Sequence, residues 1–466
     1  MKKYKTRSEF IVKENLYQVL WTLSLPLMLN NFIQTLYNLV DAFWLGQLGH
    51  EQFAATSFVW PVLYLFISIG MGTSIAGTSI LARLIGGRDI ERAEEVASHL
   101  MVLSLIFAFV FSVIGYNLTP AILNFMGAKG NFFQFSKIYL QIDFLSFPFV
   151  MVFFALQSIL AAQGNNKAIT MANTLAALTN VVLDPFFIFD EFMGVKGLGM
   201  GVAGAAYATL LSKVLLAVLG FVILRKGKME IRLHLRNFKA KANIFHEIFR
   251  VALPSTLGQM GSSFGFIILN AAIASYGTIT LAAFAMINRA TALIIQPAMG
   301  IGGSLAAIVG QNLGAGAFSR VKESLKKAIL LSLLFTGMGG LLLLIFDKEF
   351  IHLFISRSGE QGVIKEALVY LWFSIPTIPL MGFFSVFQGF FQGTGYTKYS
   401  MYMDVGRLWL IRLPMIYLFK NYTQLGSQGI WFSMTFSNVA VILYAWWLYR
   451  GGKWSSNYKK RGDIPS

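Results

Sequence analysis

Twelve long apolar stretches divide the 466-residue chain and limit what it can fold into. Most are about 20 to 30 residues long, and a helix needs roughly 20 apolar residues to cross a bilayer. Because the bilayer core offers no water to backbone groups, each crossing segment must be a helix or part of a closed barrel. The stretches are continuously apolar rather than alternating, which predicts helices. The predicted spans are 16–45, 53–82, 96–120, 137–163, 168–190, 199–224, 248–275, 279–311, 325–346, 364–392, 399–419 and 428–449.

The composition agrees with an all-α polytopic membrane protein. The chain is 56% hydrophobic and 13% charged, whereas soluble domains average about 25% charged residues. We expect no removable signal peptide, because residues 1–15 are polar and the first apolar stretch is too long for one. The absence of cysteine excludes disulfides, thiolate metal sites and cysteine nucleophiles.

The net charge of +17 would suggest nucleic acid as the partner of a soluble protein. Here Lys and Arg gather in the tails and in the connections that follow spans 2, 4, 6, 8 and 10. The positive-inside rule therefore predicts that both termini of a multi-pass membrane protein lie in the cytoplasm. We interpret the basic connection 225–250 as an orientation signal on anionic headgroups, with no nucleic-acid partner. We expect a monomer in the lipid bilayer.

The two halves of the sequence repeat each other in one register. Each half holds six spans, so both halves have the same orientation, which predicts two six-helix bundles related by a pseudo-two-fold axis along the membrane normal. The predicted domains are the tail 1–15, the bundle 16–224, the linker 225–247, the bundle 248–450 and the tail 451–466. The aligned pairs include Pro26 with Pro254, Gly49 with Gly277, Arg92 with Arg320, Ser146 with Ser374, Pro148 with Pro376 and, after one extra residue, Asp184-Pro185 with Leu413-Pro414.

Two aspartates interrupt the apolar stretches of the first half. Asp41 ends a polar series at helical spacing, and Asp184 follows Asn180 by one turn. The repeat places Leu269 and Leu413 at the matching positions of the second half. A carboxylate at membrane depth usually marks an ion or proton pathway. The residues that accompany Asp41 on its stretch are Gln34, Tyr37 and Asn38.

The chemistry of this group suits two cations. Asp41, Asn180 and Asp184 supply oxygen ligands, and Pro185 frees a backbone carbonyl one turn earlier, so together they could hold Na+. They equally suit a proton shared between two acids that cannot both ionise when close. The alternative is a structural role, in which a protonated aspartate is hydrogen-bonded to a neighbouring helix.

Pro26 and the charged residues of the second half have more than one interpretation. Pro26 predicts either a static kink or a hinge coupled to Asp41. Asp404 and Arg407 are three residues apart, and we expect them to pair, either structurally or in contact with a substrate. Arg412 lies further along. Lys213 and Arg289 are lone cations that could pair with an acid such as Asp143.

Sequence motifs of soluble catalysts are missing. The chain contains no Walker A, HExxH or GxSxG motif, and its histidines are not at metal-ligand spacing. The GxGxxG pattern at 199–204 opens an apolar helix, so we interpret it as helix packing rather than a cofactor site. We therefore expect no enzyme and no cofactor other than a coupling ion.

The chain resembles the MATE multidrug exporters, and within that family the DinF-like branch. The resemblance covers about residues 15 to 450 and is carried by LSLPLMLNNFIQTLYNLVD in the first span, N-x-x-x-D-P in the fifth and G-x-x-G-A-A-x-A-T at the sixth. It implies a cation site of Asp41, Asn180 and Asp184. Another branch of the family uses acids in spans 7 and 10, where this chain has none. Further members implied by the resemblance are Tyr37, Asn38 and Thr209.

The resemblance implies a secondary antiporter of the cytoplasmic (inner) cell membrane that exchanges inward H+ or Na+ for outward organic compounds by alternating access. The expected substrates are small amphipathic, often cationic, molecules. A lipid-linked precursor flippase of the same superfamily is the alternative. Such proteins often carry additional helices and a strongly cationic cleft, neither of which this sequence predicts.

Overall fold

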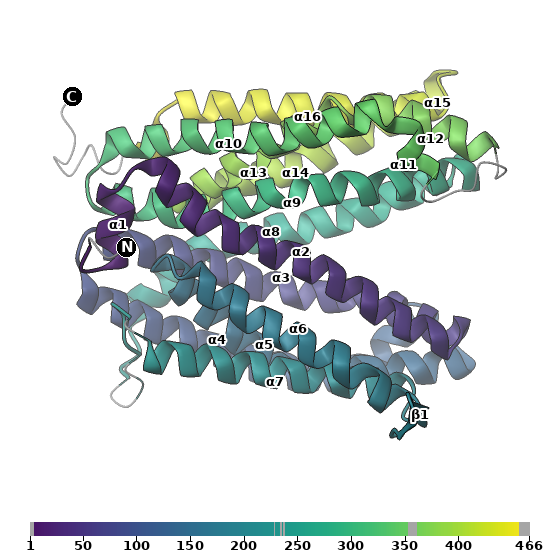
Figure 1. Cartoon of the computed structure of the whole chain (residues 1–466), viewed down its shortest axis with the longest axis horizontal. Coiled ribbons are helices and arrows are strands. Elements are labelled where there is room, and N and C mark those ends of the chain that lie inside the picture. The colour runs from purple at the N-terminus through teal and green to yellow at the C-terminus, as the bar shows by residue number, and fades with distance from the viewer. Residues whose placement is uncertain (1–3, 228, 234, 236–237, 353–360, 456–466) are drawn as a thin grey trace. The chain divides into compact units, whose positions relative to one another are not determined.

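The computed structural model describes residues 4–227, 229–233, 235, 238–352 and 361–455 (Figure 1). Helices form most of the chain, and one short antiparallel hairpin pairs Glu191 with Lys196. The elements are α1 (Arg7–Lys13), α2 (Leu16–Leu48), α3 (His50–Gly86), α4 (Ile90–Phe125), α5 (Gly130–Ala162), α6 (Asn166–Ile188), β1 (Glu191–Phe192), β2 (Val195–Lys196), α7 (Val202–Lys226), α8 (Ala242–Ala274), α9 (Thr278–Gly314), α10 (Phe318–Ile345), α11 (Asp347–His352), α12 (Gln361–Ser374), α13 (Thr377–Gly393), α14 (Thr397–Val405), the π-helix η1 (Gly406–Arg412), α15 (Leu413–Tyr422) and α16 (Ser427–Arg450).

The helices confirm an all-α polytopic membrane protein. Within the described residues, nine helices are long and apolar enough to cross a membrane, or ten if the bent pair α12 and α13 forms one span. The two other long helical runs are α2 and the continuous series α14, η1 and α15. Each predicted apolar stretch therefore overlaps a helix.

Several helices extend beyond the apolar stretch that predicted them. The structure starts α4 at Ile90, whereas the hydropathy pattern placed the start at residue 96. The Asp89 side chain accepts a hydrogen bond from the Arg92 backbone N–H at 3.3 Å, which caps this polar first turn. Hydropathy marks the part of a helix that lies in lipid, and capping determines where the helix begins.

The predicted span 364–392 is broken into two helices. The axes of α12 and α13 differ by 48°, and Pro376 lies at the break. By contrast, α5 runs continuously through Pro148, the repeat counterpart of Pro376. The second copy has a further proline, Pro379, where the first copy has Met151. Two prolines in adjacent turns remove two backbone donors, which explains why only this copy breaks.

The glycines of the GxGxxG pattern allow α7 to begin at this point and to pack closely against α6. Gly201 caps α7 with a φ of 57°, and Gly426 caps α16 with a φ of 58°, a backbone region that favours glycine. A Cβ on Gly204 would lie 2.3 Å from the Phe187 carbonyl oxygen, so a larger residue would push α7 away from α6. The structure thus confirms that this pattern packs helices closely.

The chain divides into two compact units, and the division falls inside α2 and α8. The first unit, which we call the N-unit, is Leu29–Thr256. The second, the C-unit, combines Met1–Met28 with Leu257–Ser466. The first helix of each repeat therefore begins in one unit and ends in the other.

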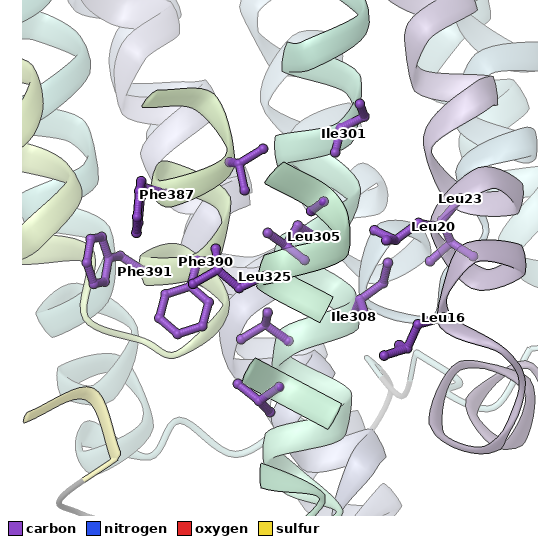
Figure 2. Packing of buried hydrophobic residues seen from close by; sticks show 14 of the residues in the cluster. Leu16, Leu20, Leu23, Ile301, Leu305, Ile308, Leu325, Phe387, Phe390 and Phe391 are labelled. Carbon is purple, nitrogen blue, oxygen red and sulfur yellow. The ribbon is translucent and has the colours of Figure 1, made fainter. Parts of the chain in front are cut away.

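The C-unit core joins the beginning of the chain to its second half. Figure 2 shows Leu16, Leu20 and Leu23 of α2 on one side of α9 and the phenylalanines of α13 on the other. The same buried cluster includes Phe10 of α1 and Trp454 beyond α16. Both described ends of the chain therefore pack at the same end of the C-unit.

The short helix α1 was not predicted, since residues 1–15 were expected to be a polar tail. The Thr6 hydroxyl accepts a hydrogen bond from the Glu9 N–H at 3.1 Å, as a helix-capping residue does. Two residues of this helix, Phe10 and Ile11, are buried. The Thr-x-x-Glu spacing was the available signal.

The connection between α7 and α8 is fixed to one end of the N-unit by buried side chains. Gln163, at the end of α5, accepts backbone hydrogen bonds from Glu230 at 2.7 Å and Ile231 at 3.3 Å through one oxygen, Oε1. His99 of α4 accepts one from Lys241 at 2.9 Å. The connection is thus an ordered part of the N-unit at these residues.

Candidate functional site

Asp41 of α2 and Asp184 of α6 meet inside the N-unit. Asp184 is fully buried and Asp41 is half-buried. Their two carboxyl groups lie close enough to interact with each other. Two neighbouring carboxyl groups resist ionising together, so this proximity favours a proton on one of them. The pair can therefore hold one proton between two acids.

Neighbouring polar side chains extend this contact into a network. Asn180 Nδ2 donates to Asp184 Oδ1 at 3.1 Å and to Thr209 Oγ1 at 3.3 Å. The Tyr37 hydroxyl interacts with Thr209 in turn. Asn180 and Asp184 lie on one face of α6 because they are four residues apart. The structure thus brings together Tyr37, Asp41, Asn180, Asp184 and Thr209, five of the residues predicted for the site.

Two buried oxygens in the network have no fixed donor. Asn180 Oδ1 and Asp184 Oδ2 are shielded from solvent and receive no hydrogen bond from a permanent donor within the described residues. A buried acceptor without a partner is unfavourable. A proton or a small cation bound at such an oxygen would satisfy it.

An ion pair lies next to the two acids. Lys213 Nζ is 2.7 Å from Asp143 Oδ1 and 3.0 Å from Ser146 Oγ. The expected pairing of Lys213 with Asp143 is confirmed. Both charges act on Asp41 through space with opposite sign. Within the described chain, neither Asp41 nor Asp184 forms an ion pair with Lys or Arg.

Other predicted residues lie apart from the network. Gln34 and Asn38 are exposed on α2 and make no hydrogen bond to another described residue. Pro26 lies within the continuous helix α2, in its C-unit part. Arg289 is exposed and forms no ion pair with any acid that the structure describes.

The sequence reasoning overlooked a second contact between α2 and α6. Asn173 Nδ2 donates to Asn30 Oδ1 at 2.8 Å, within the N-unit. Asn173 lies about two helical turns before Asn180 and therefore on the same face of α6. That spacing was a usable signal. Tyr139, whose electrostatic neighbours include Asp41 and Asp143, offered no comparable pattern in the sequence.

The donor set suits a monovalent ion rather than a resident transition metal. Across the described residues, no group of three or more His, Cys, Asp or Glu side chains could hold a metal ion. The possible Na+ ligands, Asp41, Asn180 and Asp184, are two carboxyls and one amide, the oxygen ligands that hard cations prefer.

The expected ion pair between Asp404 and Arg407 is wrong. Asp404 Oδ1 instead accepts a hydrogen bond from Gln388 Nε2 at 2.7 Å. Arg407 stacks over the Phe384 ring, 4.4 Å from its centroid. The π-helix η1 starts at Gly406, between the two residues, and its wider turn separates side chains that an α-helix would align.

Comparison with known proteins gives one consistent result. The MatE family model matches residues 26–186 and again residues 254–418. The two matches begin at Pro26 and Pro254, the positions that the internal repeat aligns. The double match confirms the duplication.

Individual relatives match over nearly the full chain. The probable multidrug resistance protein YoeA of Bacillus subtilis (strain 168) is 24% identical over 430 residues, which is 91% of this chain and 92% of that protein. A crystal structure of MATE in the bent conformation has a TM-score of 0.89 and 27% identity, with 98% of this chain and 99% of that chain covered. One in the straight conformation also scores 0.89, at 26% identity, covering 98% and 100%.

These matches agree with the residue pattern that suggested the resemblance and with the helical architecture. The family model covers more than half of the chain, and the solved relatives have the same fold throughout. The chain therefore belongs to the MatE (MATE) family, whose members are membrane transporters rather than enzymes.

Proposed function

We propose that this protein is a secondary antiporter that couples inward movement of H+ to outward export of organic compounds. The observation that carries the proposal is the proximity of the Asp41 and Asp184 carboxyls inside the N-unit. Such a pair favours holding one proton, because no lysine or arginine in the described chain pairs with either acid. Losing the proton would leave two nearby carboxylates in a low-dielectric interior, where like charges repel strongly.

Deprotonation therefore favours a different arrangement of α2 against α6. A ligand shifts such an equilibrium only by the difference in its affinity for the two states. In the proposed cycle, a proton from outside closes the Asp41–Asp184 contact and lowers the affinity for the exported compound. Solved relatives described as bent and straight support the view that this fold has more than one conformation.

We favour H+ over Na+ as the coupling ion. Sodium binding favours ionisation of both Asp41 and Asp184, whose like charges repel at close range, whereas a single proton on one of them removes that repulsion. Within the described chain, Asn180 Oδ1 and Asp184 Oδ2 receive no hydrogen bond from a permanent donor, which suits either ion. Sodium coupling is thus the alternative outcome of the test below.

The proposed setting is the cytoplasmic membrane, with both termini in the cytoplasm and the protein acting as a monomer. Phe10 and Trp454 share one buried cluster, as expected if an even number of spans separates the two ends. The basic connections follow the even-numbered spans. The names of the multidrug resistance and export relatives support small-molecule drugs as the substrates, and we propose that these are amphipathic.

The test uses purified protein in liposomes with H+ and Na+ gradients imposed separately. We expect a proton gradient alone to drive movement of a fluorescent amphipathic compound. Asp41→Asn and Asp184→Asn should each abolish this movement, while Glu51→Gln, the same acid-to-amide change at an exposed position, should leave it intact. Transport driven only by Na+ would identify Na+ as the coupling ion. Full transport in Asp41→Asn would contradict the proposal.

A further inference from the structure

Two arginines are buried in the C-unit, at the two ends of one turn of π-helix. Arg407 is 5% exposed and Arg412 is 2% exposed, and both belong to η1. Taking a guanidinium out of water is costly unless an anion accompanies it. Short π-helical segments occur frequently at functional sites.

Both guanidinium groups converge on one neutral oxygen. Arg412 Nη2 donates to Asn438 Oδ1 at 2.7 Å, and Arg407 Nη1 reaches the same atom at 3.5 Å. Arg412 also donates through Nε to Ser437 Oγ at 2.9 Å. An amide oxygen carries only a partial negative charge, so it does not neutralise two cations.

The local charges do not balance. The electrostatic neighbours of Arg407 include one acid, Asp404, and those of Arg412 include Arg407 itself. Asp404 accepts a hydrogen bond from Gln388, and within the described residues it forms no ion pair with either arginine. Arg407 Nε is buried and has no acceptor among the described residues. The cluster therefore has an excess positive charge and a donor without a partner.

The repeat shows what the C-unit lacks. The N-unit holds its partly exposed cation, Lys213, against the buried Asp143 at 2.7 Å. The register that aligns Ser146 with Ser374 places Leu371 opposite Asp143. The C-unit thus has an apolar residue, Leu371, at the place where the N-unit has the acid that pairs with its cation.

The surroundings of Arg407 are apolar. Its guanidinium lies 4.4 Å from the centroid of the Phe384 ring, and Nη1 is 2.9 Å from Met381 Sδ. Methionine and phenylalanine accept varied apolar groups. A ligand that meets this cluster would encounter positive charge beside soft apolar surface.

We propose that Arg407 and Arg412 bind the carboxylate or phosphate group of an amphipathic organic anion, whose apolar part packs near Met381 and Phe384. Guanidinium groups suit these anions because their N–H groups match the oxygen geometry. This inference extends the proposed function by giving a chemical class to one kind of substrate. Its test requires no gradient and no transport, so the two proposals can fail independently.

The experiment measures equilibrium binding to the purified full chain in nanodiscs of neutral lipid. The probe is a dansylated long-chain carboxylate, and its partner is the matching dansylated trimethylammonium compound. We expect Arg407→Gln to weaken carboxylate binding at least about tenfold, as loss of a charge-assisted contact does. Arg289→Gln, which removes an exposed cation, should leave binding unchanged. Equal carboxylate affinity in Arg407→Gln would overturn the proposal, as would tighter binding of the trimethylammonium compound to the native protein.

A second variant separates binding from folding. Asn438→Asp preserves the side-chain shape and places an internal anion between the two arginines. We expect this variant to keep or raise the thermal midpoint and to lose carboxylate binding. A folded Asn438→Asp protein that binds the probe as the native chain does would contradict the site. If inorganic phosphate displaces the probe, a free anion is sufficient for binding at this site. If only phosphatidic acid displaces it, the ligand is a lipid headgroup.

Discussion

Pro26 and Pro254 occupy the same position in two helices that each pass from one compact unit to the other. The unit boundary follows Met28 in α2 and Thr256 in α8, just after the proline in each case. Neither helix is interrupted in this structure. A proline removes one backbone hydrogen bond and so lowers the cost of a bend nearby. We therefore expect both helices to bend at these points during transport.

The first prediction concerns these prolines. Pro26→Ala restores a backbone donor in α2 and should leave substrate binding intact while weakening its pH dependence. Pro254→Ala should slow transport for the same reason in α8. Pro148→Ala is the matched control, because Pro148 lies inside α5 and away from both boundaries. If Pro26→Ala and Pro254→Ala change neither the transport rate nor its pH dependence, the two prolines have only a static structural role.

The second prediction concerns the ion pair beside the acids. Lys213→Met should destabilise the N-unit by roughly 3–5 kcal/mol, because Asp143 is left buried without its partner. Asp143→Leu combined with Lys213→Met should recover most of that loss. Thermal unfolding of the native protein, Lys213→Met, Asp143→Leu and the double variant in one detergent measures the cycle. A double variant no more stable than Lys213→Met alone would show that the pair is not energetically coupled.

The third prediction concerns the connection between α7 and α8. Gln163→Leu removes the oxygen that accepts two backbone hydrogen bonds, leaving two donors unsatisfied at about 1–3 kcal/mol each. Hydrogen exchange at Glu230 and Ile231 should accelerate by a corresponding factor. Gln163→Glu keeps an acceptor at this place and should protect both amides. Equal exchange in all three proteins would mean that the contact contributes nothing to the order of the connection.

Much of the site could be predicted because polar residues in transmembrane helices are costly in lipid and therefore gather inside the helix bundle. Asp41 and Asp184 stood out against an apolar background, and the four-residue spacing of Asn180 and Asp184 fixed their common face. The repeat showed that the second half lacks both acids. These inferences need only helical periodicity and the cost of polar groups in lipid.

The remaining features depend on local backbone geometry and tertiary contacts. Nothing in the periodicity indicated that η1 would separate Asp404 from Arg407, or that two arginines would share Asn438. The break at Pro376 needed comparison of both copies and attention to Pro379. The Thr6-x-x-Glu9 spacing indicates the start of α1, but a hydropathy pattern does not include capping residues.

The most direct test of the account asks whether substrate binding releases a proton from the Asp41–Asp184 pair. Purified protein in weakly buffered solution is mixed with a neutral amphipathic substrate, and the released protons are counted with a pH indicator. The account predicts about one proton per bound substrate, so affinity should rise with pH by linkage. Asp41→Asn should bind substrate without release, and Glu51→Gln should release as the native chain does. Binding without proton release in the native protein, or equal release from Asp41→Asn, would contradict the central claim.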